Sequence, residues 1–217
     1  MLNYKLILSL SVVTTLSIST PALAFQSSAP HIDKSQSFIY VNNSSLKDDA
    51  HEFISDLMSE GISTLENKNM SEEKRQKKFS DLLHNNFDMK TIARFSLGKY
   101  WRTSTKPEQK EYLKLFEDMI VGVYSRRFSN YDGQKIEVTE ARAEGKADII
   151  VSSVIIPETG SKIDVDWRVR KKKNGQLKVI DIIVEGVSMS MTQRSDFSSV
   201  IQRGGGKIEV LLAHLRP

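Results

Sequence analysis

The chain has no cysteine, five prolines and eleven glycines, and it has no apolar run long enough to cross a membrane as a helix. Without cysteine there can be no disulfide, so the stability of the fold has to come from its apolar core. The four histidines are scattered, and no two lie four residues apart as on the face of a metal-binding helix. We therefore expect neither a metal nor any other cofactor.

The N-terminus has the layout of a removable secretory signal. Lys5 is the only charge before a mostly apolar run at residues 6–18, which is too short and too polar to span a bilayer. Ala22-Leu23-Ala24 then gives a small-x-small cleavage pattern. We expect residues 1–24 to be a signal peptide cleaved near Ala24, residues 25–45 to be a flexible leader, and residues 46–217 to form a single domain.

What is present after this start is first helical. Apolar residues recur at steps of three and four from Ala50 to Leu65, the stripe of an amphipathic helix. Ser71 and Asp88 are suited to begin two further helices. Thr105-Lys106-Pro107-Glu108 has the composition of a capping box and predicts a long helix over Pro107–Tyr131. Two short helices, over residues 192–203 and 207–215, are expected near the C-terminus.

The pattern in the middle of the chain changes to a period of two, which is typical of strands. Four candidates follow one another at residues 136–138, 149–156, 163–169 and 179–184, with turn chemistry such as Asn174-Gly175 between them. We predict an α+β fold, in which a helical N-terminal half packs on a curved antiparallel meander of four or more strands. C-terminal helices close it, and an apolar cavity lies between the sheet and the helices.

The second and fourth candidate strands are apolar on both faces, unlike the third, which alternates cleanly. Strands of this kind are covered on both sides. Helices on both faces would explain the pattern, and so would an incomplete cover that leaves apolar space for a ligand. The sequence leaves both readings open.

Few residues suggest chemistry. Asp164 and Asp166 share a strand face with two arginines, which predicts a solvated charge ladder. Asp181, inside an apolar strand, is expected to pair with an arginine or a backbone amide. The rival reading is a small isomerase-like enzyme with Asp181 or Glu185 as its base. Lys171-Lys172-Lys173 is interpreted as a solvated hairpin tip, and nucleic-acid binding is not expected.

Several ordered motifs resemble the MlaC family, also called the toluene-tolerance auxiliary family. They are the Phe-Asp…Ile-Ala-Arg…Leu-Gly…Tyr-Trp run at Phe87–Trp101, Tyr131-Asp132-Gly133, Val184-Glu185-Gly186-Val187-Ser188, Arg194-Ser195-Asp196-Phe197 and Gly204-Gly205. The resemblance implies a carrier and not an enzyme. It implies a monomeric periplasmic protein that shuttles phospholipid and maintains the lipid asymmetry of the outer membrane.

The resemblance also implies partners and a cavity. The partners would be an inner-membrane ABC transporter complex with its substrate-binding ring protein and an outer-membrane lipoprotein–porin complex. Another amphiphile, such as a hopanoid, is an alternative cargo, and a purely structural adaptor is a further possibility. The strand alternation, the long helix stripe and the family architecture together give thirteen candidate cavity residues: Leu97, Trp101, Phe116, Ile120, Tyr124, Ile149, Val151, Val165, Trp167, Val169, Val184, Val187 and Met189.

Overall fold

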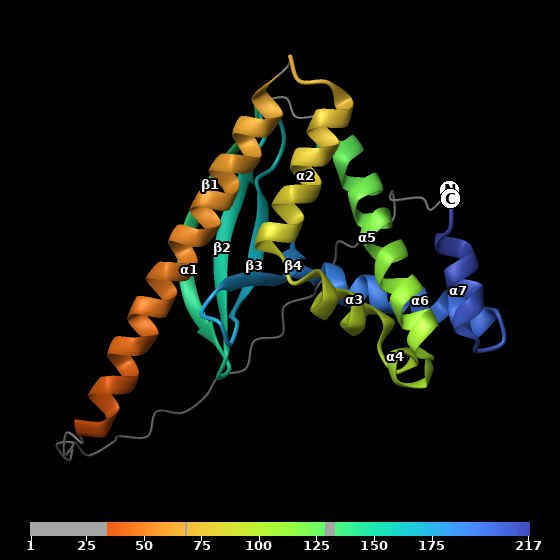
Figure 1. The fold of residues 1–217 in the computed structure, drawn as a ribbon. Coiled ribbons are helices and arrows are strands. Elements are labelled where there is room, and N and C mark those ends of the chain that lie inside the picture. The colour runs from red at the N-terminus through yellow and green to blue at the C-terminus, as the bar shows by residue number, and fades with distance from the viewer. Residues whose placement is uncertain (1–33, 68, 129–132) are drawn as a thin grey trace, which may run out of the picture. The chain divides into compact units, whose positions relative to one another are not determined.

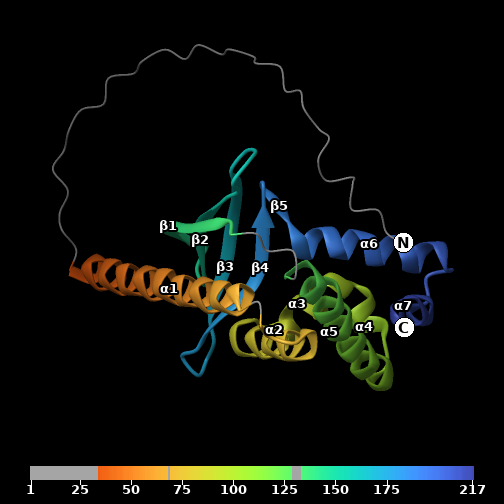
Figure 2. The same cartoon turned by 90° about the horizontal axis from the view of Figure 1, so that it is seen from above.

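Helices lie on one face of an antiparallel sheet and beside it in the computed structural model, which describes residues 34–67, 69–128 and 133–217 (Figures 1 and 2). Its elements, in chain order, are α1 (Lys34–Glu66), α2 (Glu72–Asn86), α3 (Met89–Leu97), α4 (Tyr100–Thr103), α5 (Lys106–Phe128), β1 (Lys135–Glu144), β2 (Asp148–Ile156), β3 (Ile163–Lys171), β4 (Leu177–Val184), β5 (Val187–Ser188), α6 (Met189–Arg203) and α7 (Ile208–Leu215). Residues 35–217 form one compact unit by their internal contacts. No helix of the described residues is both long and apolar enough to cross a membrane.

The expected α+β fold is confirmed, and the sheet is a five-stranded meander in the order β1-β2-β3-β4-β5. The predicted helix starts are also present. Ser71 and Asp88 cap α2 and α3 with their side chains, because each accepts a bond from a backbone N–H three residues on. Thr105 and Glu108 form the capping box of α5, in which the Thr105 N–H donates to Glu108 Oε2 at 2.6 Å.

The first helix is longer than the sequence suggested. It begins at Lys34, within the segment expected to be a flexible leader. The backbone of residues 34–45 thus continues α1 towards the N-terminus. Extending an existing helix by a residue adds a hydrogen bond without a new nucleus, so a segment with little periodicity of its own can join it at little cost. Residues 1–33, with the expected signal peptide, lie outside the described residues.

Two register shifts change which side chains face which side of the sheet. One lies in β1 between Val138 and Ala141, and the other lies opposite Arg168 and Val169, where Asp181 and Val179 are the partners and Ile180 has none. Because side chains alternate along a strand, each extra residue moves the following side chains to the opposite face. The shift at Ile180 explains why β4 reads as apolar on both faces.

Both views place α1 and α2 on one face of the sheet (Figures 1 and 2). That face is the apolar one, and the buried residues of α1, α2, β2, β3 and β4 form a single cluster on it. A second cluster lies within α3, α5, α6 and α7. Its centre is a trio of aromatic rings, Tyr112, Phe116 and Phe197, whose centroids lie 5.8–6.2 Å apart.

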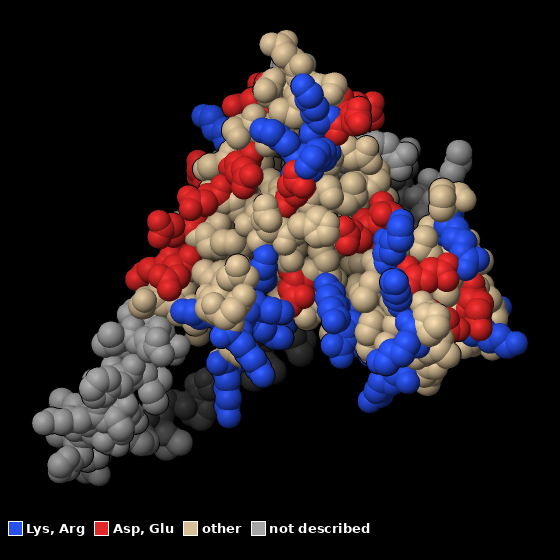
Figure 3. All heavy atoms as spheres, viewed as in Figure 1, with Lys and Arg blue, Asp and Glu red and all other residues tan. Residues whose placement is uncertain are grey.

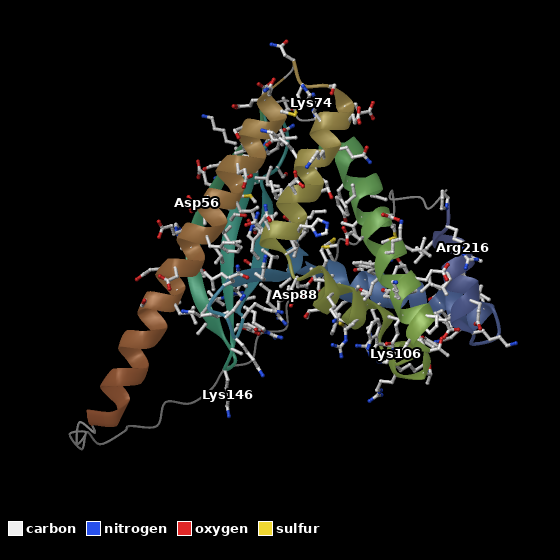
Figure 4. The ribbon with its side chains drawn as sticks, viewed as in Figure 1. Asp56, Lys74, Asp88, Lys106, Lys146 and Arg216 are labelled. Carbon is white, nitrogen blue, oxygen red and sulfur yellow. The ribbon has the colours of Figure 1, made fainter. Side chains whose placement is uncertain are left out.

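Asp88 joins the helices to the sheet (Figure 4). Its carboxylate caps α3 through the N–H of Thr91 at 3.1 Å and pairs with Lys172 of the β3–β4 hairpin. Its backbone N–H donates to the Val179 carbonyl of β4 at 2.9 Å. Burial raises the pKa of Asp88, but the bonds from Lys172 and Thr91 outweigh this effect, so the pKa lies below its ordinary value.

We expect Gly204→Ala to destabilise the fold by about 1–3 kcal/mol, because a Cβ there would lie 2.5 Å from both Cγ atoms of Val210. Its backbone is accessible to alanine, with φ −89°, so the effect is steric and not conformational. The control is Gly61→Ala in α1, where a Cβ meets nothing within 4 Å. This variant should gain about 0.5–1 kcal/mol. Urea unfolding measures both, and a neutral Gly204→Ala would contradict the close packing of α7 on the end of α6.

We also expect a pH-dependent loss from Asp88→Asn. A carboxyl whose pKa is lowered by folding stabilises the protein above its unfolded pKa, and this contribution disappears as the pH falls through the folded pKa. The variant should therefore be about 1 kcal/mol less stable than wild type near pH 7 and equally stable well below pH 4. Thermal unfolding of both proteins across this range is the measurement. A difference that persists in acid would contradict the ionic role.

Candidate functional site

The apolar face of the sheet is sealed at one end by α1 and α2. Ala50, Ile54 and Leu57 of α1 are at most 2% exposed and belong to the same cluster as Leu82 of α2. The sheet residues beneath them are also buried, and they are Ile149, Val151, Val169 and Val179. This part of the face is a closed protein core.

A polar pair lies on the same face. The Trp167 Nε1–H donates to Ser153 Oγ at 2.9 Å, and Ser153 Oγ–H donates to the Val165 carbonyl at 3.1 Å. Ser153 and Val165 are 2% and 4% exposed, so their polar atoms need these partners. The indole nitrogen and the Ser153 hydroxyl are thus both hydrogen-bonded on this apolar face.

Beyond this pair the cover becomes incomplete. Apolar side chains on the same sheet face are only half-buried there, and so are apolar side chains of the C-terminal half of α1. We call this set the apolar compartment, and its residues are Met58, Ile62, Leu65, Val138, Ile155, Ile182 and Val184. Register pairs Trp167 with Ile182 and Val165 with Val184, which puts the β4 members on the same face as the buried core.

The apolar compartment has the properties of a site for an apolar ligand. Its side chains are branched aliphatics and methionine, which offer dispersion contacts without directional hydrogen bonds. Side chains of these types are among those most often fully buried in folded domains. Seven apolar residues at one end of the sheet therefore keep part of their surface in water, and a bound apolar group would cover that surface.

The thirteen residues predicted from the sequence do not all meet. Six lie on the helix-covered sheet face: Ile149, Val151, Val165, Trp167, Val169 and Val184. Four lie in or against the core of the helical bundle: Leu97, Trp101, Phe116 and Ile120. Tyr124 is half-buried on α5, Val187 of β5 is 44% exposed, and Met189 is half-buried at the start of α6.

The long helix that the sequence assigned to the sheet face is not the helix that covers it. The sequence assigned the wall opposite the sheet to the long helix, but α1 and α2 cover the sheet face, and Phe116 packs against Tyr112 and Phe197. Met58, Ile62 and Leu65 were recognised as a helix stripe and not as site residues. The sequence signal for these residues was an apolar helix stripe that continues to Leu65, beyond the fully buried Leu57.

The opposite face of the sheet carries charged side chains among apolar ones such as Ile150 and Val154, and we call it the polar face. Its arginines pair with acidic neighbours, as the charge ladder predicted: Arg142 with Asp166 at 3.2 Å, Arg168 with Glu144 at 3.8 Å and Arg170 with Asp148 at 2.6 Å. A pocket of ≈ 350 Å³ opens here between β1, β2, β3 and β4, and Ser152, Asp166 and Ile183 are among its lining residues. No group of three or more metal-ligating side chains occurs among the described residues.

Asp181 holds α6 against β4. Its carboxylate is 7% exposed and accepts three bonds, from the Ile182 N–H at 2.9 Å, the Ser190 N–H at 3.1 Å and the Ser188 hydroxyl at 2.5 Å. The sequence expected an arginine or a backbone amide, and the structure provides amides and a hydroxyl. Ser188 also caps α6 by accepting from the Met191 N–H at 3.1 Å. Three of the roughly four acceptor positions of this carboxylate are therefore used by the fold.

Comparison with known proteins matches most of the chain to one family. The family model described as MlaC protein matches residues 55–217. The intermembrane phospholipid transport system binding protein MlaC of Haemophilus influenzae is 24% identical over 124 residues, which are 55% of this chain and 56% of that protein. The toluene tolerance protein ttg2D of Pseudomonas putida is 23% identical over 111 residues, 51% of each chain. The chain thus spans about half the length of these curated relatives.

A solved structure has the same fold. The phospholipid-binding protein from Ralstonia solanacearum, determined in complex with a phospholipid, superposes with a TM-score of 0.68 at 23% identity. The match covers 76% of this chain and 94% of that one. At this identity the likeness establishes the shared architecture.

We predict that Asp181→Asn lowers the free energy of unfolding by about 1–3 kcal/mol, because the NH₂ group that replaces Oδ2 cannot accept a hydrogen bond from the Ser188 hydroxyl. Asp196→Asn, on the exposed side of the same helix, is the matched control and should change stability by less than about 0.5 kcal/mol. Chemical denaturation compares the two. Equal stability of both variants would contradict the role of Asp181 as the anchor of α6.

Proposed function

The chain belongs to the MlaC protein family, and we propose that it is a phospholipid carrier whose apolar compartment receives acyl tails. The observation that carries this proposal is the half-burial of Ile155, Ile182 and Val184 on a sheet face that is otherwise sealed. The names of the Haemophilus and Pseudomonas relatives and the lipid bound to the Ralstonia protein support it.

The energetics of such a carrier are those of exchange. Moving two tails of roughly 16 carbons out of water gains on the order of 25 kcal/mol, at about 0.8 kcal/mol per CH₂. Tails that leave a bilayer lose nearly the same amount, so the two terms almost cancel. The carrier lowers the barrier of the aqueous step and gives the transport no direction of its own.

We further propose the setting of this transport. The chain would be exported with cleavage near Ala24, and residues 46–217 would act as one lipid-binding domain in the periplasm. It would shuttle phospholipid between an outer-membrane complex and an inner-membrane ABC transporter complex, and so maintain the asymmetry of the outer membrane. The direction would then come from the ATP-driven partner.

A carrier is favoured over an enzyme by the chemistry of the compartment. Its side chains are aliphatic or methionine. The buried acid that an isomerase would use, Asp181, lies on the other face of β4, where three hydrogen bonds tie its carboxylate to the start of α6 and to its own strand. A hopanoid would fill the same kind of space, and lipid analysis separates it from a phospholipid.

Organic extraction and mass spectrometry of the purified protein test the proposal. We expect phospholipid to be recovered from wild type and to be strongly reduced in Ile182→Trp, whose added bulk fills the apolar compartment. Ile183→Trp is the matched control, because it is the next residue of the same strand and lies on the polar face, at the ≈ 350 Å³ pocket.

The control keeps the test decisive. Loss of lipid in Ile183→Trp with full retention in Ile182→Trp would place the cargo on the polar face and contradict the proposed site. Wild-type protein that yields no lipid, although folded by circular dichroism, would contradict the carrier itself.

A further inference from the structure

The segment from α3 to the start of α5 has positively charged residues and no negatively charged ones. Residues 89–107 contain Lys90, Arg94, Lys99, Arg102 and Lys106 and no aspartate or glutamate. All five side chains are exposed. In Figure 3, lysines and arginines gather at the lower right, over α3, α4 and the start of α5.

Helix α3 divides into two faces that explain this exposure. Ala93, Ser96 and Leu97 are at most 2% exposed and pack in the helical bundle. Lys90, Arg94 and Phe95 project from the other side, and Phe95 is 39% exposed despite its apolar ring. The helix therefore presents two cations and an aromatic ring outwards.

Helix α6 completes this surface. The Arg194 guanidinium lies over the Phe95 ring at 5.3 Å, and its Nε is close enough to Gly98 that a Cβ there would be 2.8 Å away. Met191, one turn earlier on α6, is 55% exposed. We call these residues the basic helix face: Lys90, Arg94, Phe95, Lys99, Arg102, Lys106, Met191 and Arg194.

Two further cations rest on aromatic rings at this face. The Arg94 guanidinium lies 5.3 Å from the centre of the Trp101 ring, and Lys99 Nζ lies 5.2 Å from that of Tyr100. Such contacts orient the cations while leaving their charge in place, because an aromatic ring does not neutralise it.

The charges of the basic helix face are not neutralised within the described part of the chain. None of its six cations has an ion pair with a described carboxylate, whereas Lys77, Lys114 and Arg216 each pair with an acid elsewhere. Unpaired like charges this close repel one another. A partner that brings negative charge to all of them would relieve this repulsion.

We propose that the basic helix face binds the surface of an anionic phospholipid bilayer, a proposal that rests on the carrier function. Clusters of four to eight lysines and arginines on a helical surface bind anionic lipid head groups. The interspersed Phe95 and Met191 fit the headgroup boundary, where exposed aromatic and apolar side chains are inserted. A bilayer surface carries negative charge over its whole area, so it needs no one-to-one acidic pairing of the kind that a protein partner would need.

Sedimentation with vesicles tests the proposal, using full-length mature protein. Wild type should bind vesicles of phosphatidylcholine with 30% phosphatidylglycerol at low salt, and binding should fall at high salt and on pure phosphatidylcholine. Lys90→Glu with Lys99→Glu should weaken the apparent affinity by at least ~10-fold, since each cation near an anionic surface contributes about fivefold. Phe95→Ala should weaken it without changing its dependence on salt.

The control reverses the same number of charges elsewhere. Lys146→Glu with Lys162→Glu changes two exposed lysines of hairpin loops, and Figure 4 shows Lys146 at the tip of the β1–β2 hairpin, away from α3 and α4. This variant should retain most of the binding. Equal losses in both double variants would overturn the proposal, because they would reflect net charge alone.

Measuring co-purified lipid in the same variants separates the two proposals. Unchanged phospholipid content with lost vesicle binding supports the basic helix face as a docking surface. Vesicle binding by Lys90→Glu with Lys99→Glu that equals wild type overturns the proposal and leaves an acidic protein as the partner of this face. Absence of co-purified lipid in wild type that still binds anionic vesicles would instead overturn only the carrier function.

Discussion

Removal of water from one face of the sheet is the constraint on which the remaining structure depends. Two amphipathic helices, α1 and α2, cover that face. Ile54 of α1 and Val151 and Val169 of the sheet belong to one cluster there and are fully buried. Asp88 and Lys172 then fix the hairpin of β3 and β4 against the helices. Because the helical bundle has its own core around Phe116, the sheet face can be left partly uncovered at one end without loss of the whole fold.

Local chemistry decided what could be predicted from the sequence. The helix starts at Ser71, Asp88 and Thr105 follow from side chains that bond to nearby backbone groups, and they were predicted correctly. The meander follows from short turns between alternating segments. The position of each helix over the sheet is set by packing between residues far apart in the chain, which periodicity does not encode.

The candidate site divides along the same line. Val165, Trp167 and Val169 were placed correctly on one sheet face because their strand alternates cleanly. Phe116 and Ile120 were assigned to the same wall because their stripe is apolar, yet an apolar stripe does not specify its partner, and theirs is the helical bundle. Met58 and Leu65 belong to the apolar compartment because they lie on α1 where it no longer fully buries the sheet face, and the sequence does not show where that point is.

The unpaired Ile180 decides on which side of β4 the acid lies. Val179 faces α1 and α2, and in an uninterrupted strand Asp181 would face them too, while Ile182 and Val184 would point to the polar side. With one residue left over, the carboxylate turns instead towards the start of α6, and two aliphatic side chains turn towards the compartment. Regular pairing of the same residues, with Ile180 taken into the ladder, would put a carboxylate among the apolar side chains and turn two aliphatic ones away, so the bulge determines the interior as much as the composition of the strand does.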